Sequence, residues 1–410
     1  MTIFRNKPWA TLLVAVAATL AACGDDKKDN PASGGGTQPQ DVGEIRQALV
    51  TRADTNATAI SIAWRLEGQA DSIEITRRDV ASGATRRFAV PASESALNDN
   101  TVEDGKTYNY SVRAKKGNNF SASRTTVDQR VKAPVELSGD LFGDYSLSAA
   151  TRYRLTGYVR VQPGGVLRIP DGTRIEGLAG SALITVAGAD GKPSGRLFAL
   201  GTAQRPIVFT SVNTTKARGQ WGGIVLNGLA PNNGPGGRLI GEGNTGVHGG
   251  NNPNDTSGVL RYVRVEYGGT RITADNEING FTFNSVGAGT VLEFLQAHFI
   301  ADDGFEWFGG TVNAKNLVST GNDDEAFDFD NSWCGKGQFW VAVQASDIAN
   351  RGYESDNNAD GTDARAANGR ATSPLIYNVT MIGRGLSGGE TDGMYIRRGS
   401  QGRFFNHVVA

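Results

Sequence analysis

The sequence contains very little cysteine and histidine, with two cysteines and three histidines among its 410 residues. Cys23 and Cys334 provide no disulfide framework. His248, His298 and His407 have no spacing that is typical of a metal site, so we expect each to be a surface or packing residue. Their scarcity disfavours a disulfide-rich module and a histidine-ligated metal centre.

A net charge of one sign is also absent, because Lys and Arg number 41 while Asp and Glu number 42. No overall field favours nucleic acid or an anionic membrane surface, and we expect no nucleic-acid partner. Long amphipathic helical patterns are missing too. Glycine is abundant, at 55 residues, but without the three-residue repeat of collagen. This composition, with short β-branched patches, predicts an all-β fold of short strands and tight turns.

Residues 1–23 have the features of a secretory signal peptide. Arg5 and Lys7 give a basic start, and the apolar segment 10–20 is too short to span a bilayer comfortably. Residues 20–23 (LAAC) resemble the lipobox of bacterial lipoproteins. An ordinary signal peptide with an incidental cysteine is the alternative.

The lipobox resemblance implies that Cys23 is lipid-modified and becomes the first mature residue. Gly24 follows it, rather than the Asp that commonly retains such proteins in the inner membrane. The resemblance therefore implies a lipid anchor in the outer membrane of a Gram-negative cell, with the membrane face undecided. Residues 24–43 contain almost nothing to bury, so we expect a flexible tether.

Residues 44–133 contain short runs of alternating polarity, such as ISIAW at 60–64 and YNYSV at 108–112. A Trp early and a Tyr late in such a segment fit a two-sheet sandwich. The segment resembles a fibronectin type III domain, with Trp64 as the buried strand Trp and Tyr108 at the tyrosine corner. That resemblance implies a spacer more than an adhesive unit.

From residue 134 to residue 410, short strands alternate with Gly, Asn and Pro turns. One phrase recurs there, as FEW at 305–307, FDF at 327–329 and YES at 353–355. Its acids stand at positions 306, 328 and 354, which are 22 and 26 residues apart. Coils of three short strands need about this many residues, so the segment predicts a parallel β-helix. The Gly- and Asn-rich insert 241–257 is expected to project from one side of it.

Strand alternation places the aromatic residues of the repeat inside and its acids outside, one above the other. Glu306, Asp328 and Glu354 then form a ladder, and Asp330 and Asp356 share its face. Carboxylates about 5 Å apart repel one another, and an all-oxygen group of this kind suits Ca²⁺. These five residues are the candidate metal ligands.

Two alternatives to the metal site stay open. The acids could form a solvated face relieved by Lys336 or Arg351, or the strand phase could differ by one residue. Carboxylate pairs at such spacing also suit glycosidases. Residues 322–324 (NDD) faintly resemble the paired aspartates of polygalacturonases, but the expected Gly-His-Gly is missing. No arrangement of Arg resembles that of pectate lyases.

Most of the C-terminal two thirds of the chain resembles a family of bacterial exported lipoproteins with right-handed β-helix domains. The resemblance rests on PIVFTS at 206–211, QWGGI at 220–224, residues 261–269 and DDGFEWFGG at 302–310. It implies fold and location better than activity. Residues 403–410 look like the first strand of another coil, so we expect a fragment of a longer protein, with a partner that covers the end as the alternative.

Together these features predict an all-β, lipid-anchored cell-envelope protein, with a fibronectin type III-like sandwich followed by a right-handed parallel β-helix. Its expected role is non-catalytic: binding an extracellular glycan or an envelope protein, or holding a place in an envelope assembly. The alternative is a carbohydrate-active enzyme, a polysaccharide hydrolase or lyase, that uses the acidic ladder.

Overall fold

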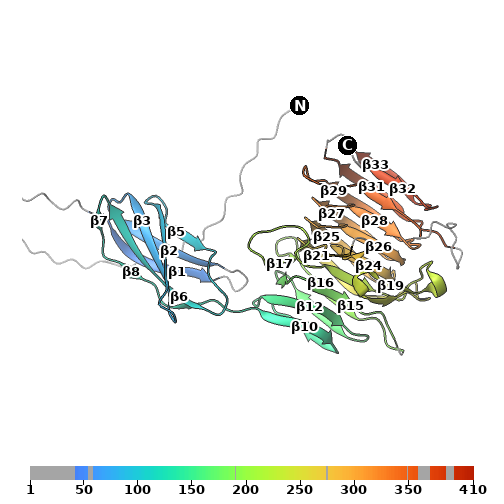
Figure 1. Cartoon of the computed structure of the whole chain (residues 1–410), viewed down its shortest axis with the longest axis horizontal. Helices are drawn as coiled ribbons and strands as arrows, with labels where there is room; N and C mark the ends of the chain where they lie inside the picture. Colours follow the sequence, from blue (N-terminus) through green and yellow to red (C-terminus); the bar gives the residue numbers. More distant parts are fainter. Residues whose placement is uncertain are drawn as a thin grey trace, which may run out of the picture. The chain divides into compact units, whose positions relative to one another are not determined.

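The computed structural model describes residues 42–53, 59–189, 191–273, 276–348, 350–358, 370–384 and 392–410. The signal peptide, Cys23 and the tether up to residue 41 lie outside these ranges. Within them the chain is almost entirely β-structure, with two short 3₁₀ helices (Figure 1). None of the described helices has the length and apolar character to cross a bilayer. The all-β prediction is confirmed.

The N-terminal folded region is a two-sheet sandwich. One sheet has the order β1-β2-β5, and the other has the order β4-β3-β6-β7, with β8 and β9 also paired to β6. Its strands are β1 (Glu44–Ala53), β2 (Ile60–Glu67), β3 (Ser72–Asp79), β4 (Thr85–Pro91), β5 (Ala96–Asp99), β6 (Thr107–Lys116), β7 (Asn119–Phe120), β8 (Arg124–Thr125) and β9 (Gln129–Arg130).

The two aromatic residues selected from the sequence lie in the sandwich core. Trp64 and Tyr108 are both buried. The hydroxyl oxygen of Tyr108 accepts a hydrogen bond from the backbone N–H of Glu103, five residues upstream, at 3.2 Å. The sandwich itself is confirmed, while its boundaries and its kinship with fibronectin type III domains stay predictions.

The remaining described residues form a right-handed parallel β-helix (Figure 1), as predicted. Its strands are β10 (Val135–Leu141), β11 (Asp144–Ser146), β12 (Tyr153–Val161), β13 (Val166–Pro170), β14 (Arg174–Gly177), β15 (Ala182–Thr185), β16 (Arg196–Leu200), β17 (Ile207–Ser211), β18 (Ile224–Asn227), β21 (Gly258–Glu266), β24 (Phe281–Val286), β25 (Val291–His298), β26 (Phe305–Gly310), β27 (Asn313–Thr320), β28 (Phe327–Asp330), β29 (Lys336–Val343), β30 (Tyr353–Ser355), β31 (Leu375–Ile382), β32 (Met394–Ile396) and β33 (Arg403–Val409). Two antiparallel hairpins interrupt the coils, β19 (Leu239–Gly241) with β20 (Gly246–His248) and β22 (Arg271–Thr273) with β23 (Asn276–Glu277). The short helices are η1 (Pro235–Gly237) and η2 (Glu242–Asn244).

Successive coils place equivalent strands side by side in parallel stacks. The first stack contains β15, β18, β24, β26, β28, β30 and β32. The second stack contains β25, β27, β29, β31 and β33. Each strand of the second stack follows directly after a strand of the first. The two stacks therefore carry side chains on separate outer faces of the same coils.

Aromatic side chains fill the interior beneath the first stack. The rings of Phe281, Phe305 and Phe327 are stacked, with centroid separations of 5.0 and 5.6 Å. Tyr353 follows with an edge-on contact to Phe327 at 5.7 Å. All four side chains are completely buried. The predicted strand phase, with the aromatic residues of the repeat inside, is confirmed.

Candidate functional site

The register of the first stack aligns the acids of the repeat. Glu306 on β26 pairs with Asp328 on β28, which pairs in turn with Glu354 on β30. The position before Glu306 is occupied by Thr282, and the position after Glu354 by Tyr395. The carboxylate ladder therefore exists, and it is three strands long.

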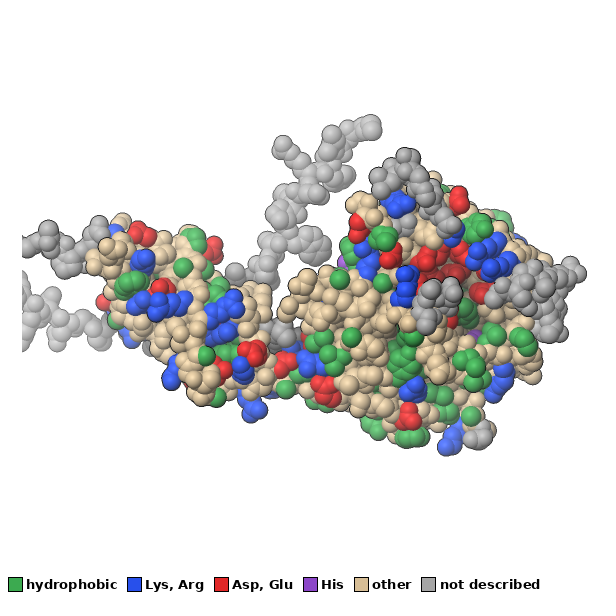
Figure 2. Space-filling view, in the orientation of Figure 1, with side chains coloured by type: hydrophobic (Ala, Val, Ile, Leu, Met, Phe, Trp, Pro, Cys, Tyr) green, Lys and Arg blue, Asp and Glu red, His purple; other side chains and the backbone are tan. Residues whose placement is uncertain are grey.

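These carboxylates point away from the aromatic core but are not solvated. Glu306, Glu354 and Asp356 are only 7, 6 and 4% exposed. Figure 2 shows acidic side chains gathered in one area of the β-helix, with Lys and Arg side chains at its edges. A freely solvated acidic face, which the sequence left open, is therefore wrong for these residues.

The hairpin β19–β20 packs on strands β18 and β24 of the first stack, next to the ladder. The side-chain amide of Asn227, on β18, donates to the carbonyl oxygen of Thr245 at 3.2 Å. Nδ1 of His248 lies 2.9 Å from the hydroxyl oxygen of Ser285, on β24. This part of the insert packs against the stack instead of projecting from it, which corrects the expectation for residues 241–248.

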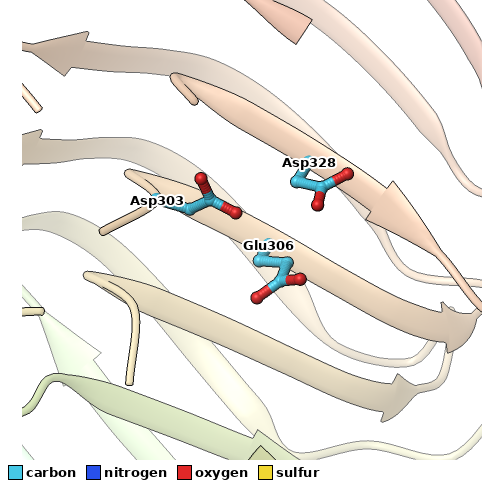
Figure 3. Close-up of side chains that lie close together, drawn as sticks. All are labelled: Asp303, Glu306 and Asp328. Carbon is cyan, nitrogen blue, oxygen red and sulfur yellow. The ribbon is translucent and has the colours of Figure 1, made fainter. Parts of the chain in front are cut away.

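One close acidic group combines two ladder residues with one that the sequence analysis did not select. Asp303, Glu306 and Asp328 each offer a carboxylate oxygen, and these oxygens lie within 4.8 Å of one another. Figure 3 shows Asp303 in the turn before β26, with its carboxylate on the same side as those of Glu306 and Asp328. The backbone N–H of Glu325 donates to Asp303 at 2.9 Å, and Asn279 donates to Glu306. We call these three acids the carboxylate cluster.

Electrostatics make the carboxylate cluster unfavourable as three free anions. Burial raises the pKa of Asp303 well above its ordinary value, and the negative charge of Glu325 raises it further. Burial likewise raises the pKa values of Glu306 and Asp328. The next cause is the negative charge of Glu242 for Glu306, and that of Glu354 for Asp328. The cluster therefore requires protons or a cation.

Two acids around the cluster also have raised pKa values. Burial, with the negative charges of Asp324 and Glu277, raises the pKa of Asp302 to about 8. Burial, with the negative charge of Asp302, also raises the pKa of Glu242 to about 8. A second close group, Asp303 with Asp324 and Glu325, extends the acidic region away from the ladder.

The other end of the ladder is neutralised by arginines. Arg351 donates to Glu354 at 2.8 Å and to Glu325 at 2.9 Å. Arg397 donates to Asp356 at 2.9 Å and also pairs with Glu354. Relief of the acidic face by Arg351 is thus confirmed. Lys336, the other candidate for this role, begins β29 in the second stack, so its proposed role is wrong.

Asp356 and Asp330, the two remaining candidate ligands, have further contacts on the same face as the ladder. Arg398 pairs with Asp356. Asp330 accepts the backbone N–H of Asn331 at 2.6 Å, and burial raises the pKa of Asp330 to about 7. The predicted set therefore divides: Glu306 and Asp328 join Asp303, Asp330 lies beside them, and Glu354 and Asp356 bind arginines.

The donor atoms of the carboxylate cluster fit a hard cation. All three residues offer oxygen, with no Cys or His in the group. Ca²⁺ takes six to eight oxygen ligands in flexible geometry, and a carboxylate can supply one or two of them. A bound divalent cation would also keep these acids ionised despite their burial. The residues present thus fit Ca²⁺.

The NDD triplet at 322–324 has mainly structural contacts. Asn322 is 5% exposed, and its side-chain oxygen accepts the backbone N–H of Ile300 at 3.1 Å. Asp324 accepts a hydrogen bond from Asn350 at 2.7 Å. His248 is buried, and burial lowers its pKa to about 3, which agrees with a packing role.

Comparisons with known proteins bear on the β-helix. The chain is similar to pectate lyase Pel3 from Pectobacterium carotovorum, at 10% identity over 90% of this chain and 91% of that chain, with a TM-score of 0.18. It is also similar to pectate lyase PelI from Erwinia chrysanthemi in complex with tetragalacturonic acid, at 8% identity, 85 and 86% coverage and a TM-score of 0.15. The fn3 domain of the human collagen α-1(XX) chain aligns at 12% identity, covering 26% of this chain and 92% of that chain, with a TM-score of 0.17.

Structural similarity at these TM-scores carries no argument about activity. No curated protein matches the chain. A family model described as a pectate-lyase-like β-helix domain, however, matches residues 139–410, which is more than half of the sequence. The protein therefore belongs to the family of pectate-lyase-like β-helix domains.

Proposed function

We propose that the protein is a lipid-anchored component of the cell envelope whose β-helix binds a glycan without cleaving it. In this proposal Ca²⁺ occupies the carboxylate cluster. The observation that carries it is the buried pair Asp303 and Glu306 with the half-buried Asp328, whose carboxylate oxygens lie within 4.8 Å of one another. Such a group is costly unless a cation or protons neutralise it.

The ligand class is supported by the family of the β-helix and by chemistry. The family model that matches residues 139–410 describes a pectate-lyase-like β-helix domain, and pectate is a polymer of uronate. A bare acidic face repels a polyanion, but bound Ca²⁺ supplies positive charge and open coordination positions for sugar oxygens. The anchor is supported by residues 20–23 (LAAC). An outer-membrane location is supported by Gly24, which follows Cys23 in place of the Asp that commonly retains lipoproteins in the inner membrane.

Binding without cleavage is supported by the state of the remaining acids. Glu354 and Asp356 are held by Arg351, Arg397 and Arg398, so neither is free to act as a base or a nucleophile. The test is calorimetry with uronate tetramers in Ca²⁺ and in chelator, using full-length protein. Tighter binding in Ca²⁺ is expected, together with unchanged oligomer length after long incubation. Equal affinity in chelator and Ca²⁺ would contradict the role of the cation.

One observation favours the enzyme alternative. Asp330 has a pKa raised to about 7, which is suited to general acid–base catalysis near neutral pH. It lies on the ladder face near Arg397 and Arg398; burial raises its pKa, and the positive charges of these arginines oppose that rise. The measurement is product formation from polyuronates, followed as new reducing ends and as the ultraviolet absorbance of unsaturated products. Turnover that is lost in Asp330→Asn would establish the enzyme and exclude the non-catalytic role.

A further inference from the structure

The outer face of the second stack carries a groove that is separate from the carboxylate cluster. It has a volume of about 470 Å³, which lies within the usual range for small-ligand sites. Its polar lining comes from three consecutive strands and includes Asn313, Lys315, Lys336 and Gln338. Tyr377, on β31, forms one end. Figure 1 shows β27, β29 and β31 one after another in the stack.

The register explains why these side chains converge. Lys315 on β27 pairs with Gln338 on β29, which pairs with Tyr377 on β31. Lys315 and Gln338 lie on one side of the groove, and Asn313 and Lys336 lie on the other. The floor between them is formed by Ala314 and Gly337, which pair with each other. A Cβ at Gly337 would lie 2.4 Å from the ring of Trp340, so the glycine is required for packing. The Cβ position of Gly337 thus points into the core, and the backbone of this residue forms the floor of the groove.

The groove has an excess of positive charge. Its single acid, Glu293, already pairs with Arg261 at 2.9 Å. Glu293 is the cross-strand neighbour of Lys315, but among the described residues neither Lys315 nor Lys336 forms an ion pair with an acid. From strand and residue spacing their backbones are roughly 8 Å apart, so both flexible side chains can reach one anion. An anionic ligand is thus favoured here, whereas the first stack presents carboxylates.

An aromatic platform lies next to these lysines. The ring of Tyr377 is 39% exposed, and the ring of Phe405 is stacked behind it with a centroid distance of 4.9 Å and an interplanar angle of 15°. One ring face is therefore covered by Phe405, and the ring lines the end of the groove next to Gln338. An amphipathic ring of this kind offers an apolar face to the C–H groups of a sugar.

We propose that this groove is a second glycan-binding site, which takes an acidic sugar residue and needs no Ca²⁺. The sugar carboxylate pairs with Lys315 and Lys336, its ring stacks on Tyr377, and Gln338 binds its hydroxyl groups. The ligand class rests on the glycan-binding function proposed above, but the site does not depend on the carboxylate cluster. Two sites on separate faces would let one β-helix hold an acidic polysaccharide at two points.

The test is calorimetry of the full-length protein with tetragalacturonate in chelator, with a neutral hexose tetramer for comparison. Binding of the uronate alone is expected, weakening as salt is added. Lys315→Gln and Lys336→Gln should each weaken binding about tenfold, because each removes a charge-assisted contact. Tyr377→Ala should also weaken it about tenfold.

Matched controls are available on exposed positions away from the groove. Lys192→Gln and Phe142→Ala should leave affinity within about twofold, since both side chains are exposed and lie outside the groove. The lysine variants alter exposed side chains only, so equal melting temperatures show that the fold is intact. Asp303→Asn with Asp328→Asn should keep full affinity in chelator.

The outcomes separate this site from the proposed function. Absence of tetragalacturonate binding in chelator, or affinity unchanged in both lysine variants, overturns the second site even if Ca²⁺-dependent binding persists. Binding in chelator that is lost in the lysine variants establishes it, even if Ca²⁺ adds nothing and the function proposed for the carboxylate cluster fails.

Discussion

Removal of Ca²⁺ is expected to make the β-helix less stable as the pH rises from 5 to 8. The acids of the carboxylate cluster and its surroundings have pKa values that are higher in the folded chain than in the unfolded chain. The folded state therefore holds protons that the unfolded chain releases above pH 4. The contribution of these acids to the free energy of unfolding is fully present below that pH, and it is lost as the pH rises toward their pKa values in the folded chain.

The size of the effect can be worked from one residue. The pKa of Asp302 is raised to about 8 in the folded chain. A single carboxyl of this kind lowers the free energy of unfolding by about 1.4 kcal/mol per pH unit, or about 4 kcal/mol between pH 5 and pH 8. The neighbouring acids titrate as a coupled group, so their individual losses do not add.

The assay is urea unfolding of the full-length protein at several pH values, in chelator and in about 1 mM Ca²⁺. In chelator the free energy of unfolding should fall with pH. In Ca²⁺ the fall should shrink or reverse, because the cation binds the ionised carboxylates. A free energy of unfolding that is constant or rises with pH in chelator would refute the reasoning, since the acids would then be ionised at little cost.

Three further predictions follow from the core, the groove and the signal peptide. Phe327→Ala should lower the free energy of unfolding by about 3–5 kcal/mol, because it removes a completely buried ring. Asp328→Asn should lower it far less in the absence of Ca²⁺. Equal losses for the two variants in denaturant unfolding would mean that the strand phase is wrong. Gly337→Ala should destabilise the fold through its clash with Trp340, and a melting temperature equal to the parent's would contradict that packing. Cys23→Ser should abolish labelling by palmitate and membrane retention, and unchanged labelling would exclude the lipid anchor.

The sequence was informative where a regular repeat determines position. Each of Glu306, Asp328 and Glu354 stands between two residues suited to a core. Strand alternation sends those neighbours inside, and the similar length of the coils brings the acids into register. The aromatic interior and the carboxylate ladder could therefore be predicted without a structure.

The remaining parts of the site depend on contacts between residues far apart in sequence. Asp303 lies in the turn before β26, where alternation does not apply; only the DDG at 302–304, just before the repeat, could have pointed to it. The hairpin β19–β20 brings the charge of Glu242 close to Glu306, although it precedes Glu306 by more than fifty residues. Arg397 and Arg398 come from the end of β32, and no repeat placed them beside Glu354 and Asp356.

The groove of the second stack was beyond pattern reasoning for a different reason. Its strands bend at one residue each that has a left-handed backbone, including Phe294 with φ 56° and Phe339 with φ 61°. Bulky residues rarely adopt this conformation, so the sequence predicts neither the bends nor the faces beside them. Lys336 illustrates the consequence, because it was considered for the acidic face and lies on the other stack.

Calorimetric titration of Ca²⁺ into the full-length protein at about pH 7.5 tests the central claim, that the carboxylate cluster is a cation site. One site with a dissociation constant of about 10 μM is expected, within the range of natural Ca²⁺ sensors. Asp303→Asn with Asp328→Asn should abolish binding, and Asp144→Asn, at an exposed carboxylate elsewhere, should not. Absence of Ca²⁺ binding by the parent protein, or equal binding by the double variant, would contradict the account.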